Sequence, residues 1–364
     1  MDVPFVIDGH NDLPWEIREQ FGLGLVGLDL VGGCESVQTD LPRLRAGRVG
    51  AQFWSVFVPG ELSGEAAVTA TLEQVDLVRR IVAGHPRDLM LATSAADLER
   101  IVAGGRIASL MGVEGGHSIN GSLGALRMLH ALGARYLTLT HNQSLPWADS
   151  ATDAPRAGGL SGFGFEVVAE LNRLGMFIDL SHVADTVMHQ TLDVATAPVL
   201  FSHSSARAVC DIARNVPDDV LGRLPTNGGV CMVAFAAMFV KQPVADWYLE
   251  TIARVEERGE DPRSYADVMA VVAERRDREP IPACTAQDVA DHLDHIREVA
   301  GIDHVGLGSD FDGAPSFPTD LADVSAYPRL FEVLRDRGWS QQDVTAVAHG
   351  NVLRAMRDME HAAG

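Results

Sequence analysis

The chain has 364 residues, of which 46% are hydrophobic and 6% aromatic, a balance that supplies a large aliphatic core and excludes a disordered chain. Its formal net charge of -21 excludes nucleic acid as a partner, because a phosphate backbone would be repelled. No stretch approaches the roughly 18 apolar residues that cross a bilayer, so we expect no membrane partner.

The first apolar run, Val3 to Ile7, begins almost at the first residue. No basic segment, apolar leader or cleavage site stands ahead of it, and we therefore expect a cytoplasmic protein. The four cysteines are far apart and form no C-x-x-C pair, so in a reducing compartment we expect thiols. They are Cys34, Cys210, Cys231 and Cys284.

Eight short apolar runs rich in β-branched residues recur along the chain, most of them followed by a helix-period segment. Strands that are apolar throughout and alternate with helices indicate a parallel sheet. Eight of them favour a closed barrel over an open doubly wound sheet, and no G-x-G-x-x-G follows the first. We therefore predict an α/β fold, a single (β/α)₈ TIM barrel domain over residues 1–364. The runs are Val3–Asp8, Val49–Phe57, Ile107–Val113, Arg135–Thr140, Met176–Leu180, Pro198–Ser202, Gly229–Phe235 and His304–Gly308.

Capping-box patterns predict where three of the helices begin. They are Ser94 with Asp97, Thr285 with Asp288, and Ser340 with Asp343, the last opening the final helix.

Two insertions fall on the C-terminal side of predicted strands, where barrel loops form active sites. Ser144–Phe163 is rich in Gly, Ala and Pro, and Ala236–Pro282 contains charged helical segments. Each is either an ordinary surface excursion or a cover for substrate.

Polar residues stand directly after six of the eight runs. In a barrel these positions converge on the C-terminal mouth, so four histidines and three carboxylates are expected to meet there. The segments are Asp8-Gly9-His10-Asn11-Asp12, Glu114-Gly115-Gly116-His117, His141, His182, His203 and Ser309-Asp310-Phe311-Asp312. Gly115 and Gly116 are expected to allow tight backbone passage, and His117 is expected to be structural.

This convergence predicts a metal pair. His10 and Asp12 are two residues apart at a strand end, so both side chains point to the same side and can bind one ion. His182 and His203, which end adjacent strands, can hold a second ion. Mixed nitrogen and oxygen ligands without thiolate suit Zn²⁺, with Mn²⁺ or Co²⁺ as alternatives.

The two ions still need a bridging anion. Lys241, the only lysine, lies beyond the seventh run and outside any ligand position, so a carboxylated lysine is excluded. Glu114, at the end of the third run, is the remaining candidate. The expected cofactor is therefore two Zn²⁺ per chain, bridged by Glu114 and a hydroxide, which would also polarise a scissile carbonyl.

Two residues are expected to assist catalysis. Asp310 can accept the proton of the attacking water and pass it to the leaving amine, and we prefer it to Asp312, which alternates to the other face. His141 has no evident metal partner and is interpreted as a donor to the oxyanion. A third metal ligand, or a residue that supports the ligands, is the alternative for His141.

Arg214 follows the sixth run and so lies on the loop side of the barrel. Its guanidinium could bind a substrate carboxylate in bidentate fashion. An ion pair with Asp218 or Asp219 is an equally good interpretation of the sequence alone. Trp54 and Trp147 are interpreted as packing residues.

These motifs resemble the renal (membrane) dipeptidase family of the amidohydrolase superfamily, in order and over nearly the whole chain. The matching segments besides those above are Gly50–Ser55, Leu139–Asn142, Asp179–His182, Phe201–Ala206, Arg214–Asp219 and Ala290–Ile296. The resemblance implies zinc ions on His10 with Asp12 and on His182 with His203, bridged by Glu114. It also implies His141 and Arg214 as substrate contacts and Asp310 as the proton shuttle.

The resemblance further implies hydrolysis of dipeptides (L,L and L,D), β-lactam opening in mammalian members, and homodimers. Cys210 and Cys284 resemble positions that are disulfide-linked in secreted relatives, but here we expect them reduced. Ala236–Pro282 is longer than in mammalian relatives, so substrate preference is not carried over. The alternatives are an amidohydrolase acting on another carboxylate-bearing amide, such as an N-acyl amino acid or lactam, and a non-catalytic barrel binding protein.

Overall fold

A computed structural model describes residues 3–363 of the chain. Its strands are all parallel and form one sheet, in which β2 pairs with both β1 and β4. That second pairing closes eight strands into the predicted barrel, in the order β1-β2-β4-β5-β6-β7-β8-β9. The strands are β1 (Val6–Asn11), β2 (Val49–Phe57), β3 (Leu89–Leu91), β4 (Ile107–Glu114), β5 (Ala134–Thr138), β6 (Phe177–Asp179), β7 (Leu200–Phe201), β8 (Val230–Val233) and β9 (Val305–Leu307).

Each of the eight predicted strands is confirmed, within a few residues at its ends. The short strand β3 was not predicted. It pairs with Ile107–Ser109 at the start of β4, whereas β5 pairs with β4 only from Met111 onward. The strand therefore covers an edge that the barrel leaves open, and three residues are too few to show a period of their own.

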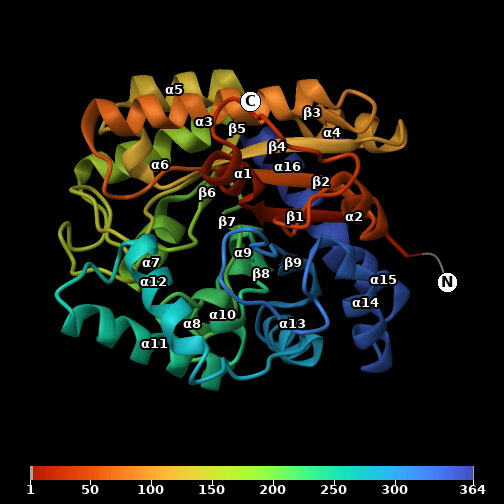
Figure 1. The fold of residues 1–364 in the computed structure, drawn as a ribbon. Coiled ribbons are helices and arrows are strands. Elements are labelled where there is room, and N and C mark those ends of the chain that lie inside the picture. Colours follow the sequence, from red (N-terminus) through yellow and green to blue (C-terminus); the bar gives the residue numbers. More distant parts are fainter. Residues whose placement is uncertain (1–2, 364) are drawn as a thin grey trace.

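Helices surround the barrel, with α3 and α5 on one side and α13 and α14 on the opposite side (Figure 1). They are α1 (Leu13–Phe21), α2 (Leu41–Ala46), α3 (Gly64–Gly84), α4 (Ala95–Ala103), α5 (Leu123–Leu132), α6 (Gly162–Leu174), α7 (Asp185–Val194), α8 (Asp218–Leu221), α9 (Leu224–Asn227), α10 (Ala237–Val240), α11 (Gln242–Glu257), α12 (Tyr265–Arg276), α13 (Ala286–Ala300), α14 (Tyr327–Asp336), α15 (Gln341–Thr345) and α16 (Asn351–Ala362). Of the helices within residues 3–363, none is long and apolar enough to cross a membrane.

The predicted helix starts are mostly confirmed. Complete capping boxes open α13 at Thr285 and α15 at Ser340. At Ser94 the box is only half formed: the serine caps α4, but the Asp97 carboxylate accepts a hydrogen bond from Thr93 instead. The last helix was predicted as one continuous helix, but a π-helical turn over Ala346–Gly350 separates α15 from α16.

Large buried side chains fill the interior of the barrel below its C-terminal mouth. Phe53, Tyr136 and Phe177 are completely buried there, and the rings of Phe53 and Tyr136 lie 5.4 Å apart. Because these side chains fill the barrel interior, polar groups can surround a cavity only at the strand ends.

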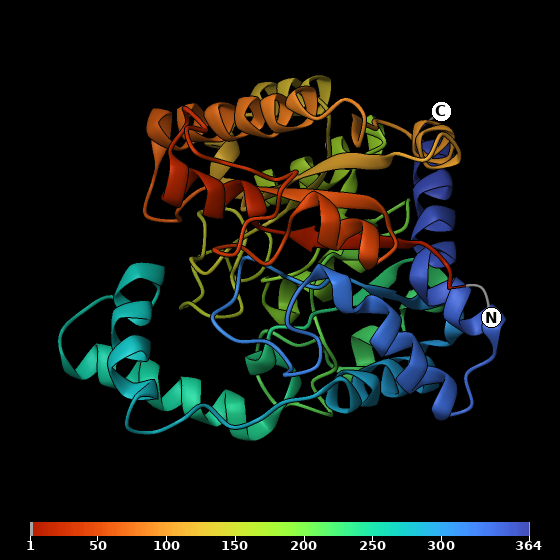
Figure 2. The same cartoon turned by 45° about the vertical axis from the view of Figure 1, so that its right-hand side comes forward.

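The two predicted insertions differ in structure. Ser144–Phe163 forms loop and turn up to the start of α6. Ala236–Pro282 forms α10, α11 and α12, and its predicted helical segments are thereby confirmed. Figure 2 shows α11 and α12 projecting away from the ring of helices as an arm. We call residues 237–276 the arm.

Candidate metal centre

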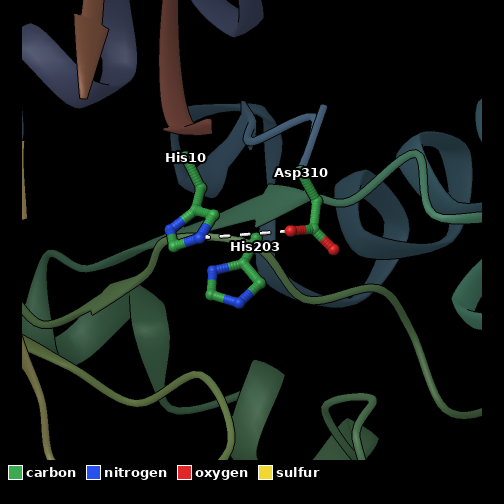
Figure 3. Close-up of side chains that lie close together, drawn as sticks. All are labelled: His10, His203 and Asp310. Atoms are coloured by element: carbon green, nitrogen blue, oxygen red, sulfur yellow. Dashed lines mark ion pairs between the residues drawn. The ribbon is translucent and has the colours of Figure 1, made fainter. Parts of the chain in front are cut away.

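The strand ends bring the predicted ligands together. His10 lies in β1, Glu114 ends β4, and His182 and His203 follow β6 and β7. His10 is completely buried, and the other three expose no more than 7% of their surface. Figure 3 shows His10 and His203 from separate strand ends converging with Asp310. The convergence predicted from the sequence is therefore present.

Glu114 lies between the two predicted ligand pairs. Its Oε2 atom is 3.4 Å from His10 Nε2, and His10 Nε2 is 3.1 Å from Asp12 Oδ2. Its Oε1 atom is 3.0 Å from His182 Nε2 and 3.3 Å from His203 Nε2. One carboxylate oxygen therefore faces each pair, which is the arrangement required of a bridging ligand.

The donor atoms fit metal ions. The Nε2 atoms of His182 and His203 face each other at 3.0 Å, and the buried Oδ1 atom of Asp12 has no hydrogen-bond partner within residues 3–363. His10, Asp12 and Glu114 form one group that could hold an ion, and Glu114, His141 and His182 form another. Imidazole nitrogens and carboxylates without thiolate are the ligand set of catalytic zinc sites.

Charge and burial set protonation states that suit metal binding at Glu114, His182 and His203. At His10, nearby Tyr136, Glu114 and Asp12 outweigh burial and raise the pKa well above its ordinary value. Burial lowers the pKa of His182 and of His203 well below the ordinary value, so both rings are neutral near pH 7. For Glu114, burial is outweighed by His10 and by hydrogen bonds from the histidines, which hold its pKa well below its usual range. Neutral imidazoles and an ionised carboxylate are the forms that ligate metals.

Buried polar side chains support the ligands from behind, and sequence patterns had not singled these residues out. Tyr136 Oη lies 2.7 Å from His10 Nδ1. Ser202 Oγ lies 2.7 Å from His203 Nδ1 and donates to Asp179. Such contacts fix the ring orientation of metal-binding histidines. Asp179 and Ser202 lie in the matching segments Asp179–His182 and Phe201–Ala206, but the contact between these two residues on neighbouring strands has no local signal.

Asp310 lies three residues after β9, with its Oδ1 atom 4.0 Å from His10 Nε2. Burial raises its pKa well above the ordinary carboxyl value. Its backbone has φ +66°, and His182 has φ +69°, so both residues adopt the left-handed conformation. Backbone conformations that L-residues rarely adopt gather at functional sites because the surrounding structure must enforce them.

Asp310 and Asp312 both line the cavity but have different surroundings. Asp312 accepts a hydrogen bond from the backbone N–H of Gln38 at 2.6 Å and donates its own N–H to the Gln38 side chain. It thereby fastens the loop before α2, and burial raises its pKa to about 7. Gly313 completes the turn, because a Cβ atom there would lie 2.1 Å from Asp12 Oδ2 and 2.7 Å from Asp310 Oδ1.

Arg214 is buried in the same cavity with 4% of its surface exposed. It donates to Ser204 Oγ at 2.7 Å and to the His203 carbonyl at 3.1 Å, and it lies over the ring of Phe239. Burial lowers its pKa to about 10.

The alternative of an ion pair between Arg214 and Asp218 or Asp219 is wrong. Those carboxylates pair with His295 and His189 on the outside of the barrel. The Arg214 guanidinium is therefore held by neutral groups and, among the described residues, has no carboxylate within 4.0 Å.

His141 follows β5, with its Nε2 atom 4.0 Å from Glu114 Oε1 and its side chain 16% exposed. Burial lowers its pKa to about 4, so the neutral ring can donate a hydrogen bond or bind a metal ion. It also belongs to the Glu114 and His182 group, so geometry leaves both interpretations of His141 available.

A cavity of about 480 Å³ opens over these residues. Ala151 and Thr152 of the first insertion and several residues of the arm line it, so both insertions contribute to the walls of the site. Arg263 of the arm reaches Asp153 of the first insertion at 3.4 Å.

The structural roles predicted for the remaining residues are confirmed. Gly115 has φ +104°, and a Cβ atom on Gly116 would lie 2.4 Å from the Leu139 carbonyl. His117 is bound to the Val58 carbonyl at 3.0 Å, and Trp54 and Trp147 are buried in the core. Lys241 pairs with Asp288 at 3.1 Å and does not line the cavity.

Of the cysteines, Cys210 and Cys284 are buried free thiols. Burial raises the pKa of each to about 12, which makes both thiols unreactive near neutral pH.

Comparison with known proteins matches residues 2–364 to the family described as membrane dipeptidase, peptidase family M19. The chain is 43% identical to Dipeptidase 3 of Mus musculus over 99% of its own length and 65% of that protein. It is 42% identical to Dipeptidase 3 of Homo sapiens over 98% of its length and again 65% of the relative. The chain thus spans slightly less than two thirds of these relatives.

Among solved structures, a metallo peptidase from Rhodobacter sphaeroides shares the fold. It matches with a TM-score of 0.81 and 24% identity over 98% of this chain and 100% of that one.

Proposed function

The chain belongs to the membrane dipeptidase family, peptidase family M19, and we propose that it is a metal-dependent dipeptidase that hydrolyses the peptide bond of dipeptides. The observation that carries the proposal is the position of Glu114, whose two oxygens face His10 and the pair His182 and His203 separately. Arg214 is buried in the same cavity and, among the described residues, has no carboxylate within 4.0 Å. It therefore supplies a site for the free carboxylate of a dipeptide.

We propose two zinc ions as the cofactor, one held by His10 and Asp12, the other by His182 and His203, with Glu114 on both. Such ions supply an activated water and polarise the scissile carbonyl. The support is the donor set and the unpartnered buried Asp12 oxygen. The chain's own part is to hold Glu114 ionised and His182 and His203 neutral.

The remaining residues act on substrate and protons. The raised pKa of Asp310 suits a group that takes a proton from the attacking water and returns it to the leaving amine. His141, neutral because burial lowers its pKa to about 4, donates its ring N–H to the carbonyl oxygen as negative charge develops. Arg214 binds the α-carboxylate and sets the distance from that group to the cleaved bond.

The purified chain, supplied with zinc or cobalt, is tested on a library of L,L and L,D dipeptides with release of free amino acids as the readout. We expect turnover and about two metal ions per chain. No turnover of any dipeptide at saturating metal would overturn the proposal.

Arg214 also allows a second candidate, hydrolysis of another carboxylate-bearing amide such as an N-acyl amino acid or a lactam. We expect Arg214→Ala to reduce kcat/KM for dipeptides about a hundredfold, mainly through KM, because a charged contact is lost. Dipeptide amides, which lack the carboxylate, should be affected far less. Faster turnover of N-acyl amino acids than of dipeptides by the unaltered chain would favour the second candidate.

Homodimer formation and a cytoplasmic location stay predictions. The first is checked by light scattering on the purified chain.

A further inference from the structure

The cavity has a second wall that the proposed chemistry does not use. Opposite the strand ends it is lined by apolar side chains of the arm: Met238, Phe239, Leu249, Ile252, Val268 and Met269. Leu249 is 51% exposed although it is a large aliphatic residue on a helix. An uncovered apolar surface inside a cavity next to polar anchors is typical of a ligand pocket.

The wall is fixed in place from both sides. Arg275 of α12, which is buried, donates to the carbonyl of Trp247 in α11 at 2.6 Å, and its guanidinium lies 4.4 Å from the Trp247 ring centroid. Arg263, two residues before α12, pairs with Asp153 of the first insertion at 3.4 Å. The apolar residues therefore form a surface that is built before substrate arrives.

Arg214 fixes which part of a dipeptide meets this wall. The centre of its guanidinium is 5.1 Å from the Phe239 ring, and Met238 and Phe239 stand at the beginning of the arm. A carboxylate bound by Arg214 belongs to the C-terminal residue, whose side chain is attached to the next carbon. That side chain is thus placed beside the arm, whereas the N-terminal residue lies beyond the cleaved bond, near the metal ligands.

We propose that the arm is a specificity pocket selecting dipeptides whose C-terminal residue has a bulky apolar side chain. This inference rests on the proposed dipeptidase function and adds the substrate class. A cavity of about 480 Å³ has room for such a dipeptide, since small-molecule pockets are commonly about 300–1,000 Å³. Each additional methylene group of the substrate that is buried in the pocket raises the affinity for that substrate about fourfold.

The test compares kcat/KM for Ala-Leu with that for Ala-Ala, with the C-terminal residue in each configuration, and includes the reversed dipeptide Leu-Ala. We expect Ala-Leu to exceed Ala-Ala by at least about tenfold and Leu-Ala to gain much less. Equal rates for Ala-Leu and Ala-Ala, or a preference that follows the N-terminal residue, would overturn the inference while leaving the dipeptidase proposal intact. Absence of turnover with all three would overturn the dipeptidase proposal itself.

The chain offers a matched pair of variants. Leu249→Asn changes the pocket, and Leu72→Asn changes a leucine of α3 that is 44% exposed and does not line the cavity. We expect Leu249→Asn to reduce the Ala-Leu to Ala-Ala ratio about tenfold and Leu72→Asn to leave it unchanged. An unchanged ratio in Leu249→Asn, with the variant folded by circular dichroism, would remove the arm from substrate selection.

Discussion

The strand ends and the arm line the same cavity but are held in place by different contacts. At the strand ends, buried hydrogen bonds connect one strand to the next: Asp179, the last residue of β6, accepts from Thr138 of β5 and from Ser202 after β7. In the arm, α11 and α12 are joined by Arg275, which reaches the Trp247 carbonyl and the exposed Glu250 carboxylate, and by the exposed ion pair of Arg258 and Glu274. The strand ends are held by hydrogen bonds between buried side chains, whereas the two arm helices are joined in part by ion pairs with exposed carboxylates.

This difference separates chemistry from selectivity. Groups that hold metal and move protons need positions fixed within fractions of an ångström, which a closed barrel supplies. A wall that only covers an apolar side chain needs shape and hydrophobicity, and it tolerates exchange of its residues. We therefore expect substitutions at the strand ends to abolish turnover and substitutions in the arm to change which dipeptide is preferred.

Asp310→Asn gives the largest effect expected at the strand ends. Asparagine tolerates the left-handed backbone at this position as aspartate does, so the fold is retained. It cannot accept the proton, and we expect kcat to fall by about 10³-fold with metal content unchanged. The measurements are steady-state kinetics and elemental analysis of the same sample. A rate within a few-fold of the parent chain would remove Asp310 from the mechanism.

Gly313→Ala tests whether the strand ends lack spare room. The added methyl carbon would lie 2.1 Å from Asp12 Oδ2 and 2.7 Å from Asp310 Oδ1, so one carboxylate must move. We expect kcat/KM to fall about a hundredfold for every dipeptide, because a 1 Å displacement at a catalytic group costs that order. Gly84→Ala, where nothing lies within 4 Å of the added carbon, is the control. Equal activity of the two variants would contradict this view of the turn.

The sequence predicted the strand ends well for a physical reason. Parallel strands of a barrel deliver their C-terminal residues to one mouth, so His10, Glu114, His182 and His203 could be placed together without knowing any contact. Their supports could not be read in this way. The contacts of Tyr136 with His10 and of Arg214 with Ser204 depend on side-chain directions that no spacing encodes.

For the arm, the sequence predicted less. Its charged helical segments were expected, but nothing in residues 236–282 indicates which face meets the cavity. Leu249 and Ile252 are three apart, a spacing equally typical of a helix that packs on a core. Likewise, the break between α15 and α16 at Ala346–Gly350 interrupts a pattern that continues on both sides of it.

Arg275→Ala should loosen the arm and spare the chemistry. The arginine is buried, and its removal takes away one of the donors to the Trp247 carbonyl, which still accepts from the Thr251 hydroxyl, and the arginine's hydrogen bond to that hydroxyl. We expect the Ala-Leu to Ala-Ala ratio of kcat/KM to fall several-fold, and the free energy of unfolding to fall by about 1–3 kcal/mol. Arg258→Ala, which removes an exposed ion pair with Glu274 in the same arm, should change neither. A loss of turnover on both substrates alike would show that the arm also supports the metal centre.

His292 of α13 joins the two regions. Its Nδ1 atom accepts a hydrogen bond from the Ala206 backbone N–H, after β7, at 3.0 Å. Its Nε2 atom donates to the Val240 carbonyl, at the end of α10, at 2.8 Å. The contact with Ala206 requires the neutral ring, because a protonated Nδ1 atom cannot accept, and burial lowers the pKa of His292 to about 4.

The pH dependence of stability follows from that lowered pKa. The unfolded chain binds a proton at His292 below about pH 6.5, whereas the folded chain does so only near pH 4, so acid favours unfolding between these values. The contribution of His292 to the free energy of unfolding is fully present above pH 6.5 and is lost as pH falls toward 4. At pH 5 the free energy of unfolding is expected to be about 2 kcal/mol lower on this account. Urea unfolding at pH 7.5 and pH 5 measures it.

The comparison that isolates His292 is with His292→Gln, because the histidines of the metal centre are the same in both chains. Glutamine can still donate to Val240 but does not titrate, so the variant should lose less stability than the parent between pH 7.5 and pH 5. His304→Gln, at a half-buried histidine bound to the Gly229 carbonyl, should resemble the parent more closely. If His292→Gln and the parent lose equal stability, protonation of this ring does not govern the junction between the strand ends and the arm.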